Sequence, residues 1–473
     1  MVLVTRQQQL FFAIEDTEGT AKSLTTSSDA ILALELSSSI TKDMVDRGAV
    51  SASLSRETDN VGRGGIEFTF GVDLRGGGDL TTAPVWGPLL RACGWKQHVS
   101  TRSEALVQYI ASDSSGATCV AGEVLTFAGG SGATARCLQN SATTSATNVF
   151  ITDISGTPSG AVSGSRSGTS AWTSDGAVTE SGFKYTPDST TAVRLDYASK
   201  TGVPAVGETY KGASSGAFGV LKAVGTTGAT AEEAKFDMVP GTGNFSAGET
   251  LNDQASGSSK AYVVHASPDI KLDRTPSLTI EHRQNGLFRR GVGCRGNVQL
   301  QLESGTPARL YFTFTGSLSS TGDAALATDA SYSSVAVTRF AQGYFGVGTD
   351  QAFPVSSFEF DCGNSVALRA DPTGTNGDLS AVISDRDPTV SIDPEMVNTA
   401  TFDWLGGWGN ATTMSGLATV GTTQGNRVAI EFPKLQVSSL GDGDRDGIWT
   451  GDVELKAKRN TAAGNDEAAI YVY

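Results

Sequence analysis

The chain has 473 residues, of which 38% are apolar, so it is long enough and apolar enough to form several hydrophobic cores. Fifty acidic residues against 35 basic ones give a net charge of −15. This balance argues against attractive nucleic-acid binding, which needs Lys and Arg to neutralise phosphates, but leaves room for repulsive contact with DNA. The 57 glycines, with Ser and Thr crowded between apolar runs, favour short strands and tight turns, so we expect a mainly β protein.

No export or membrane signal is expected. The first residues lack the basic stretch, apolar core and cleavage site of a signal peptide, and no run of about 18 apolar residues is long enough to cross a bilayer. The five cysteines show no zinc spacing and are expected to be buried thiols: Cys93, Cys119, Cys137, Cys294 and Cys362. Cys119 and Cys137 flank one repeat unit and could meet across strands, although a reducing cytoplasm disfavours that bond.

The first half of the chain predicts two strands, a helix and a hairpin. The strands are expected over 49–59 and 66–74, and the hairpin over 293–302 and 308–316, because apolar and polar residues alternate there. A helix is expected over 86–93. Its apolar residues follow the i, i+3, i+4, i+7 spacing, Pro88 falls in the first turn, and Gly94 suits a C-terminal cap.

Two stretches, 113–181 and 199–266, interrupt this first half. Both repeat one motif, a Gly followed by an acidic or small residue and a short apolar run, and then a Ser-Gly turn. The motif occurs at 121–135, 206–218 and 247–259, with a weaker copy at 159–170. Each unit predicts a hairpin, so each stretch predicts a small β module of two hairpins. Because the modules interrupt loops without breaking the order of their host, we expect them to project from its surface.

The second half repeats the order of the first. Strands are expected over 378–388 and 389–393, a helix over 401–408, and strands over 425–432 and 448–455 around a turn at 441–447. We therefore interpret the chain as two related β domains with insertions. The first domain comprises 1–112, 182–198 and 267–325, the inserted modules are 113–181 and 199–266, and the second domain is 326–473.

Two short motifs resemble known sites. Residues 212–216 match the G-x-S-x-G nucleophile elbow, which requires a strand-to-helix turn with a histidine and an acid nearby. Here the motif lies in a Ser/Gly repeat whose sister copies do not keep it, and the chain has three histidines. Residues 442–447 begin like a calcium loop, but position 12 is Val453 instead of Glu, which favours a hairpin turn.

Tryptophans at helical spacing favour core packing over ligand stacking, and this interpretation covers Trp86, Trp404 and Trp408. We expect no catalytic residue, no cofactor site and no metal site. The chain is therefore expected not to be an enzyme.

One set of motifs resembles the tail tube proteins of long-tailed bacteriophages. The set consists of Arg56-Glu-Thr before an alternating strand and a Gly-rich loop, the helix segment 83–94, Tyr185-Thr-Pro-Asp-Ser189, Asn285-Gly286 and Gly293-Cys-Arg-Gly296. The segment Glu15-Asp-Thr-Glu-Gly-Thr20 is also similar to the end of that family's N-terminal arm. The resemblance covers most of residues 45–320 apart from the two inserted stretches.

This resemblance implies a structural virion protein without catalytic residues. Domains of the β-sandwich or barrel type, each with one short helix, would stack as rings into a tail tube through which genomic DNA passes. Implied partners are other copies of the chain, tail-tip and tail-terminator proteins, and the tape measure protein and DNA inside the tube. Assembly would occur in the host cytoplasm.

The duplication and the charge give this resemblance two further consequences. If both halves adopt the tube fold, three chains supply six units, so we expect a trimeric ring, with a hexamer as the alternative. An acidic channel would repel phosphates and let DNA slide. The alternative functions are a β-rich adhesin or surface-layer protein, favoured by the Ser/Gly/Thr repeats, and another virion part such as a tail-tip or head-decoration protein.

Overall fold

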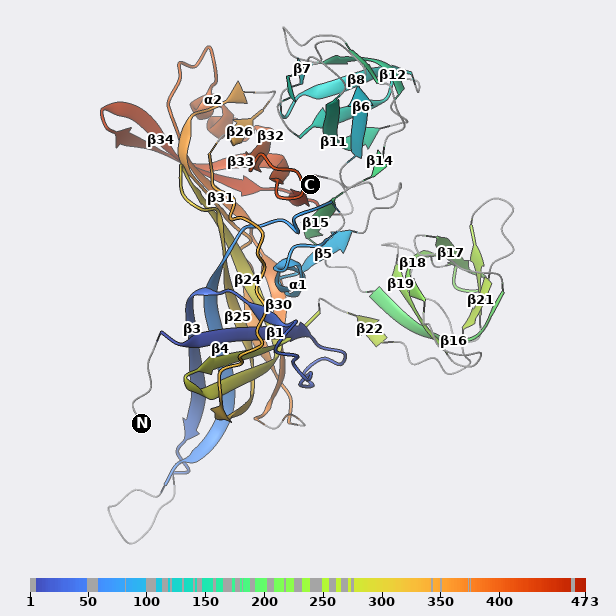
Figure 1. The fold of residues 1–473 in the computed structure, drawn as a ribbon, viewed down its shortest axis with the longest axis vertical. Coiled ribbons are helices and arrows are strands. Elements are labelled where there is room, and N and C mark those ends of the chain that lie inside the picture. Colours follow the sequence, from blue (N-terminus) through green and yellow to red (C-terminus); the bar gives the residue numbers. More distant parts are fainter. Residues whose placement is uncertain are drawn as a thin grey trace. The chain divides into compact units, whose positions relative to one another are not determined.

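The structure of the chain is a computed structural model. It describes residues 6–48, 58–80, 82–98, 108–112, 118–119, 121–129, 132–138, 141–142, 147–155, 159–164, 172–174, 179–180, 182–187, 192–201, 208–216, 218–224, 232–238, 249–254, 261–264, 271–273, 276–341, 343–348, 351–372, 374, 376–460 and 464–473. Two compact units are present: Met1–Pro187 with Pro276–Tyr473, and Asp188–Thr275. The described residues form antiparallel sheets and two short helices, so the mainly β prediction is confirmed (Figure 1).

Six strands of the larger unit form a first series. They pair antiparallel in the order β1–β23–β24–β25–β4–β3. Their bounds are Gln8–Ile14 (β1), Leu278–Gln284 (β23), Gly286–Glu303 (β24), Arg309–Ala324 (β25), Asn60–Asp73 (β4) and Leu34–Val45 (β3). Helix α1 (Gly87–Ala92) follows β4 along the chain. Of the strand expected over 49–59, residues 49–57 lie outside the described residues.

Six further strands form a second series. They pair antiparallel in the order β26–β32–β33–β34–β31–β28. Their bounds are Tyr344–Val347 (β26), Thr413–Val420 (β32), Val428–Arg445 (β33), Ile448–Ala457 (β34), Thr389–Pro394 (β31) and Val355–Asp361 (β28). Helix α2 (Trp404–Gly409) follows β31. Strand β28 also pairs with β24, so the two series share one sheet.

Shorter strands complete the larger unit. Strand β2 (Ala30–Ile31) pairs with β1, and β27 (Gln351–Ala352) pairs with β26. Strand β15 (Phe183–Pro187) lies between β5 (Trp95–His98) and β35 (Ala469–Val472), and β35 pairs with β33. Strands β29 (Asn364–Ala370) and β30 (Asp378–Arg386) form a separate hairpin.

The turn expected at 441–447 is wrong. Strand β33 continues to Arg445, and Gly441 and Gly443 take part in its ladder with β34. Only Asp446 and Gly447 turn, with φ of 55° and 84°. A two-residue hairpin loop of this kind needs positive φ at both positions, and Asp-Gly supplies it.

The first module is a sheet with the strand order β11–β9–β8–β12–β13–β6–β14, closed by pairing of β11 with β6. The bounds are Gln108–Ser112 (β6), Val124–Gly129 (β8), Thr134–Cys137 (β9), Thr147–Ser155 (β11), Ser159–Gly164 (β12), Trp172–Ser174 (β13) and Thr179–Glu180 (β14). A two-stranded ribbon of β7 (Thr118–Cys119) and β10 (Ser141–Ala142) accompanies it. This sheet begins before the sequence boundary at 113.

The second module, the smaller compact unit, has the matching order β19–β18–β17–β20–β21–β16–β22, closed by pairing of β19 with β16. The bounds are Ala192–Thr201 (β16), Thr209–Gly212 (β17), Phe218–Val224 (β18), Glu232–Met238 (β19), Thr250–Asp253 (β20), Ala261–Val264 (β21) and Lys271–Asp273 (β22). Its sheet extends beyond the boundaries 199 and 266, because β16 and β22 belong to it.

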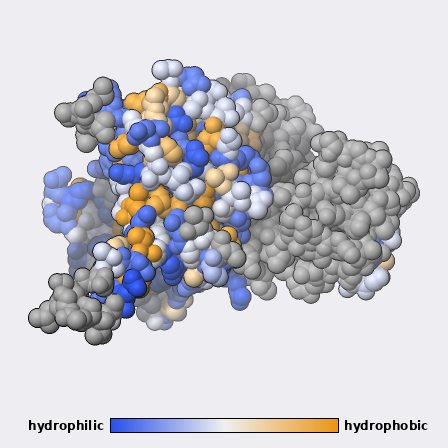
Figure 2. Space-filling view, turned by 90° about the horizontal axis from the view of Figure 1, so that it is seen from below, coloured by the Kyte–Doolittle hydropathy of each residue, from blue (hydrophilic) through white to orange (hydrophobic). Residues whose placement is uncertain are grey.

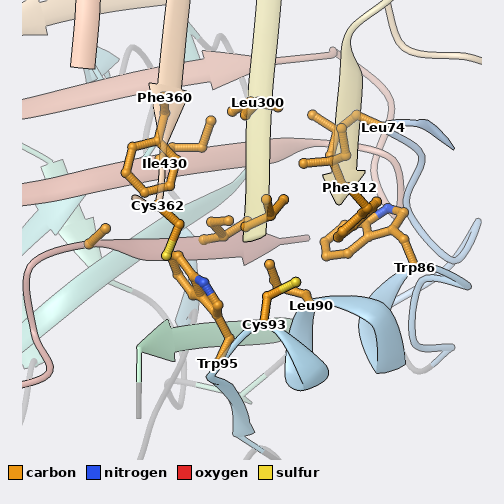
Figure 3. Close-up of a cluster of buried hydrophobic side chains, with 14 of the residues drawn as sticks. Leu74, Trp86, Leu90, Cys93, Trp95, Leu300, Phe312, Phe360, Cys362 and Ile430 are labelled. Carbon is orange, nitrogen blue, oxygen red and sulfur yellow. The ribbon is translucent and has the colours of Figure 1, made fainter. Parts of the chain in front are cut away.

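One hydrophobic core runs beneath both strand series. The helical stripe Trp86, Leu89, Leu90 and Cys93 is fully buried in it, as its spacing predicts. Figure 3 shows α1 lying under β24 and β25 side chains, with Trp95 beside Phe360 and Cys362. The chain leaves α1 at Gly94, whose φ of 83° suits a glycine after a helix end.

Candidate functional surfaces

One polar face runs across the strands shared by the two series. On β4, β25, β24, β28, β31 and β34, apolar residues point into the core, and the alternate residues point outward. Register places Arg309, Gln301, Glu359, Ser391 and Glu454 in one row across five strands. The outward-facing residues of the single strands therefore form one continuous surface.

This surface, termed here the acidic sheet face, carries more carboxylates than cations. Its outward-facing charged residues are Glu67, Asp73, Glu303, Glu359, Asp361, Asp393, Asp452 and Glu454, against Arg63, Arg309, Arg445 and Lys456. Arg445 is held by Asp393 and Glu395 at 2.9 and 2.8 Å. Lys456 pairs with Asp387. Arg63 pairs with Asp378. Local ion pairs thus hold three of these four cations, which leaves the face electronegative.

Strand β28 joins the two series. Phe360 pairs with Val390 of β31 on one side and with Leu300 of β24 on the other. Its ring packs on Trp95 after α1 and on Phe432 of β33, at centroid distances of 6.2 and 5.3 Å. The junction is therefore hydrogen-bonded along its length and apolar beneath.

The β29–β30 hairpin extends this junction over the first series. Asp378 pairs with Arg63 of β4, and the Ala381 carbonyl accepts a hydrogen bond from Arg295 of β24. Ser380 donates to Glu18 of the N-terminal segment. Burial acts to raise the pKa of Glu18, but the Ser380 hydroxyl and Arg295 outweigh it and hold that pKa below its usual value.

The N-terminal segment is fixed by a second carboxylate, Glu15. This buried side chain accepts hydrogen bonds from the backbone N–H of Gly19 and Gly293, both at 2.8 Å, and from the hydroxyls of Ser277 and Thr279, at 2.6 and 3.1 Å. Glu15 lies in the arm segment that carries the tail-tube resemblance. Three of these four partners, Ser277, Thr279 and Gly293, lie more than 250 residues from Glu15 along the chain, and no local sequence pattern indicates such contacts.

The first module packs against the C-terminal segment of the larger unit. Thr152 donates to the Tyr471 hydroxyl, which donates to Glu431 of β33, both at 2.8 Å. The Tyr473 hydroxyl donates to the Leu138 carbonyl at 3.0 Å, and burial raises the pKa of Tyr473 above its usual value. The sequence did not indicate this contact, because a single Thr, Tyr or Glu within a strand forms no pattern that identifies a distant partner.

In the second module, Glu249 explains the repeated Gly-Glu and Ser-Gly pattern. Its buried carboxylate accepts from the backbone N–H groups of Ser214 and Ser215, both at 2.9 Å, and from the Ser215 hydroxyl at 2.8 Å. The Glu of one hairpin thus holds the Ser turn of the other. The G-x-S-x-G match at 212–216 is this strand-to-strand turn, not a strand-to-helix elbow.

Replacing Glu249 with Ala should loosen that turn. Two backbone donors and a hydroxyl lose their acceptor, which should lower the free energy of local opening by about 1–3 kcal/mol. Hydrogen–deuterium exchange should accelerate over strands β17 and β18. Ser214→Ala is the matched control, because only the backbone N–H of Ser214 contacts Glu249. Equal exchange in Glu249→Ala and the control would contradict this role.

The tryptophan prediction is correct for two of its three residues. Trp86 and Trp404 are buried, and Trp404 packs on Phe402 and Phe353, at centroid distances of 4.6 and 5.4 Å. Trp408 is 43% exposed, so its assignment to the core is wrong. Helix α2 ends at Gly409, and of its residues only Trp404 is buried.

The structure also places the calcium-loop candidate and the cysteines that the sequence analysis singled out. Segment 442–447 is the tip of the β33–β34 hairpin, where Trp449 donates to Asp442 at 3.1 Å. The predicted burial is confirmed for Cys93, Cys137, Cys294 and Cys362, whereas the Cys119 side chain lies outside the described residues. Within the described ranges, no group of three or more His, Cys, Asp or Glu side chains is arranged to hold a metal.

Comparison with known proteins adds no family assignment. The chain matches no protein-family model, and no curated protein matches it significantly in sequence. Neither of the described helices has the length and apolar run that a membrane crossing requires.

Proposed function

We propose that this protein is the subunit of a bacteriophage tail tube: it closes into rings, and the rings stack into a channel for genome passage. The observation that carries the proposal is the shared sheet. Two strand series of the same pairing order are joined edge to edge through β28 and β24, and one acidic face runs across both. A sheet that continues in this way is suited to form the wall of a tube.

The matching order supports an internal duplication. In each series a long hairpin lies between two equivalent strands: β24–β25 lies between β23 and β4, and β33–β34 lies between β32 and β31. The helix follows the strand that pairs with the second strand of the hairpin, so α1 follows β4 and α2 follows β31. In this interpretation the series are the two tube domains, 1–112 with 182–198 and 267–325, and 326–473, and the two modules are insertions in the first. Three chains then supply six units, and the ring is a trimer.

The acidic sheet face supports an inward orientation of that surface. Carboxylates spaced along a channel wall repel DNA phosphates, so DNA passes without specific binding. In the virion, the tube would also contact the tape measure protein inside it and the tail-tip and terminator proteins at its ends. These roles involve assembly and transport, with no catalysis.

The test is assembly of the purified chain. At high concentration it should form long hollow filaments by negative-stain electron microscopy, and native mass measurement of a solubilised ring should give three chains. Chains that stay monomeric at high concentration would instead favour the β-rich adhesin or surface-layer alternative. Six chains per ring would make residues 326–473 an outer domain.

A further inference from the structure

We infer that the β3–β4 hairpin of one chain docks on strand β33 and helix α2 of a second copy of the chain, with β3 pairing along the outer edge of β33. The inference rests on the proposed ring and names the surfaces that close it. Its template is the contact within the chain, where β28 pairs along the outer edge of β24 and the β29–β30 hairpin lies over the first series.

Strand β3 occupies in the first series the position that β28 occupies in the second. Each pairs with the strand that precedes the helix, β4 or β31. The paired segments also share a pattern, since Leu34-Glu-Leu36 matches Phe358-Glu-Phe360. Strand β28 uses its other edge to pair with β24, whereas among the described residues β3 pairs with β4 alone. The other edge of β3 therefore has no strand partner among the described residues, and the Arg289 side chain donates a hydrogen bond to the Ser38 carbonyl of β3 at 3.0 Å.

The complementary edge lies on β33. Leu300 of β24 pairs with Leu310, which pairs with Val72 of β4. In the second series, Leu440 pairs with Val453, which pairs with Ile392 of β31. Segment 439–443 of β33 is thus equivalent to segment 299–303 of β24.

Strand β28 covers segment 299–303, but segment 439–443 pairs, among the described residues, only with β34. The two open edges are in equivalent positions. An extended strand added to such an edge is held by its backbone hydrogen bonds.

Exposed apolar residues mark the same hairpin. In the second series, Ala381 of β30 is fully buried against the first series. The β3–β4 hairpin instead exposes Ile40, Met44, Val45 and Val61, with Met44 and Val61 61% and 62% exposed. Figure 2 looks from the end where this hairpin projects and shows apolar surface among hydrophilic residues. Apolar side chains gathered on one projecting hairpin mark an interaction surface.

Helix α2 shows the matching lack of cover. The C-terminal end of α1 is covered by the second series, because the Asn364 amide of β29 donates to the Cys93 carbonyl at 2.7 Å. The corresponding end of α2 carries Trp408, and Leu405 beside it is 64% exposed. The incoming β3–β4 hairpin would cover these residues as β28 and β29 cover α1.

The two surfaces differ, so the contact is head-to-tail and repeats in one direction. A heterologous contact of this kind closes a ring when its rotation divides a full turn. Because the contact within the chain already joins two units, the contact between chains needs to be made only once per chain. The second copy is favoured over an unrelated partner because this chain already contains both halves of the interface.

Cysteine cross-linking tests the pairing. If the contact between chains repeats the contact within the chain, Ser37 lies opposite Ser439 of the next chain, as Asp361 lies opposite Gln299 within the chain. Opposed residues in an antiparallel ladder lie about 4.5–5.5 Å apart between Cα atoms, a separation that a disulfide spans. Chains carrying Ser37→Cys are mixed with chains carrying Ser439→Cys and oxidised mildly, and a two-chain band is expected on a non-reducing gel. Thr313→Cys replaces Ser37→Cys in the control, since Thr313 is exposed on the same face but paired on both sides.

The outcomes separate the inference from the function. Wild-type chains that never assemble would overturn the proposed ring. Chains that assemble but give no band above the Thr313→Cys control would overturn only this pairing. As a second measure, Met44→Asp with Val61→Asp should raise the concentration needed for assembly about tenfold or more. Leu287→Asp, at another exposed apolar position, should change it little, and equal effects would contradict the docking.

Discussion

Replacing Glu303 and Glu359 with Lys is expected to make assembled tubes retain DNA. Both side chains are exposed on the acidic sheet face, on neighbouring strands β24 and β28. Each exchange replaces a repelling charge with one that neutralises a phosphate, and a ring repeats it in every chain. Cosedimentation of filaments with double-stranded DNA at low salt should increase at least about tenfold and fall steeply as salt is added.

Two controls make this result specific. Glu303→Gln with Glu359→Gln keeps the side-chain shape and should bind DNA much less than the Lys variant. Asp16→Lys with Asp329→Lys changes the net charge equally at exposed acids off that face. If the Asp16→Lys, Asp329→Lys variant retained as much DNA as the Glu303→Lys, Glu359→Lys variant, net charge alone would decide DNA retention. The acidic sheet face would then not line the channel.

Replacing Glu15 with Ala is expected to destabilise the larger unit strongly. The carboxylate satisfies two backbone N–H groups and two hydroxyls in a site where Ser277, Thr279 and Glu15 are all buried. Losing a shared acceptor for several buried donors should lower the free energy of unfolding by about 3 kcal/mol. The midpoint of urea unfolding, followed by tryptophan fluorescence, measures this effect.

Asp16→Ala is the matched control for Glu15→Ala. Asp16 is the next residue, its side chain is 82% exposed, and it pairs only with the partly exposed Lys22 in the ion pair that the structure shows. An exposed pair of this kind contributes about 0–1 kcal/mol. A Glu15→Ala midpoint that matches the Asp16→Ala midpoint would show that the N-terminal segment is not held by this carboxylate.

Local features of the fold were open to prediction from sequence. Period-two alternation identified β4, β24, β25 and β34, since a strand with one buried face must alternate. Helix α1 was identified by its apolar spacing and by Gly94. The hairpin at Asp446-Gly447 was foreseen, although its turn was placed too broadly, because Gly441 and Gly443 resemble turn residues when their ladder partners are unknown.

The candidate surfaces depended on contacts between distant residues. Glu249 was noticed as part of a repeat, but its hydrogen bonds to the Ser214 turn required the closed sheet of the module. Trp408 was assigned to the core by spacing alone, since spacing does not show whether another element covers a helix. The packing of the first module on Tyr471 and Tyr473 joins strands more than 300 residues apart.

The sequence by itself determined a mainly β chain with two short helices and a strong acidic balance, because alternation, spacing and charge are local or summed properties. Only the tertiary structure decided that acids from five strands share one face, that β28 crosses between the series, and that β3 and segment 439–443 of β33 keep open edges. The physical reason is that register and edge pairing depend on which distant strands meet, and a shift of one residue reverses the face of every side chain.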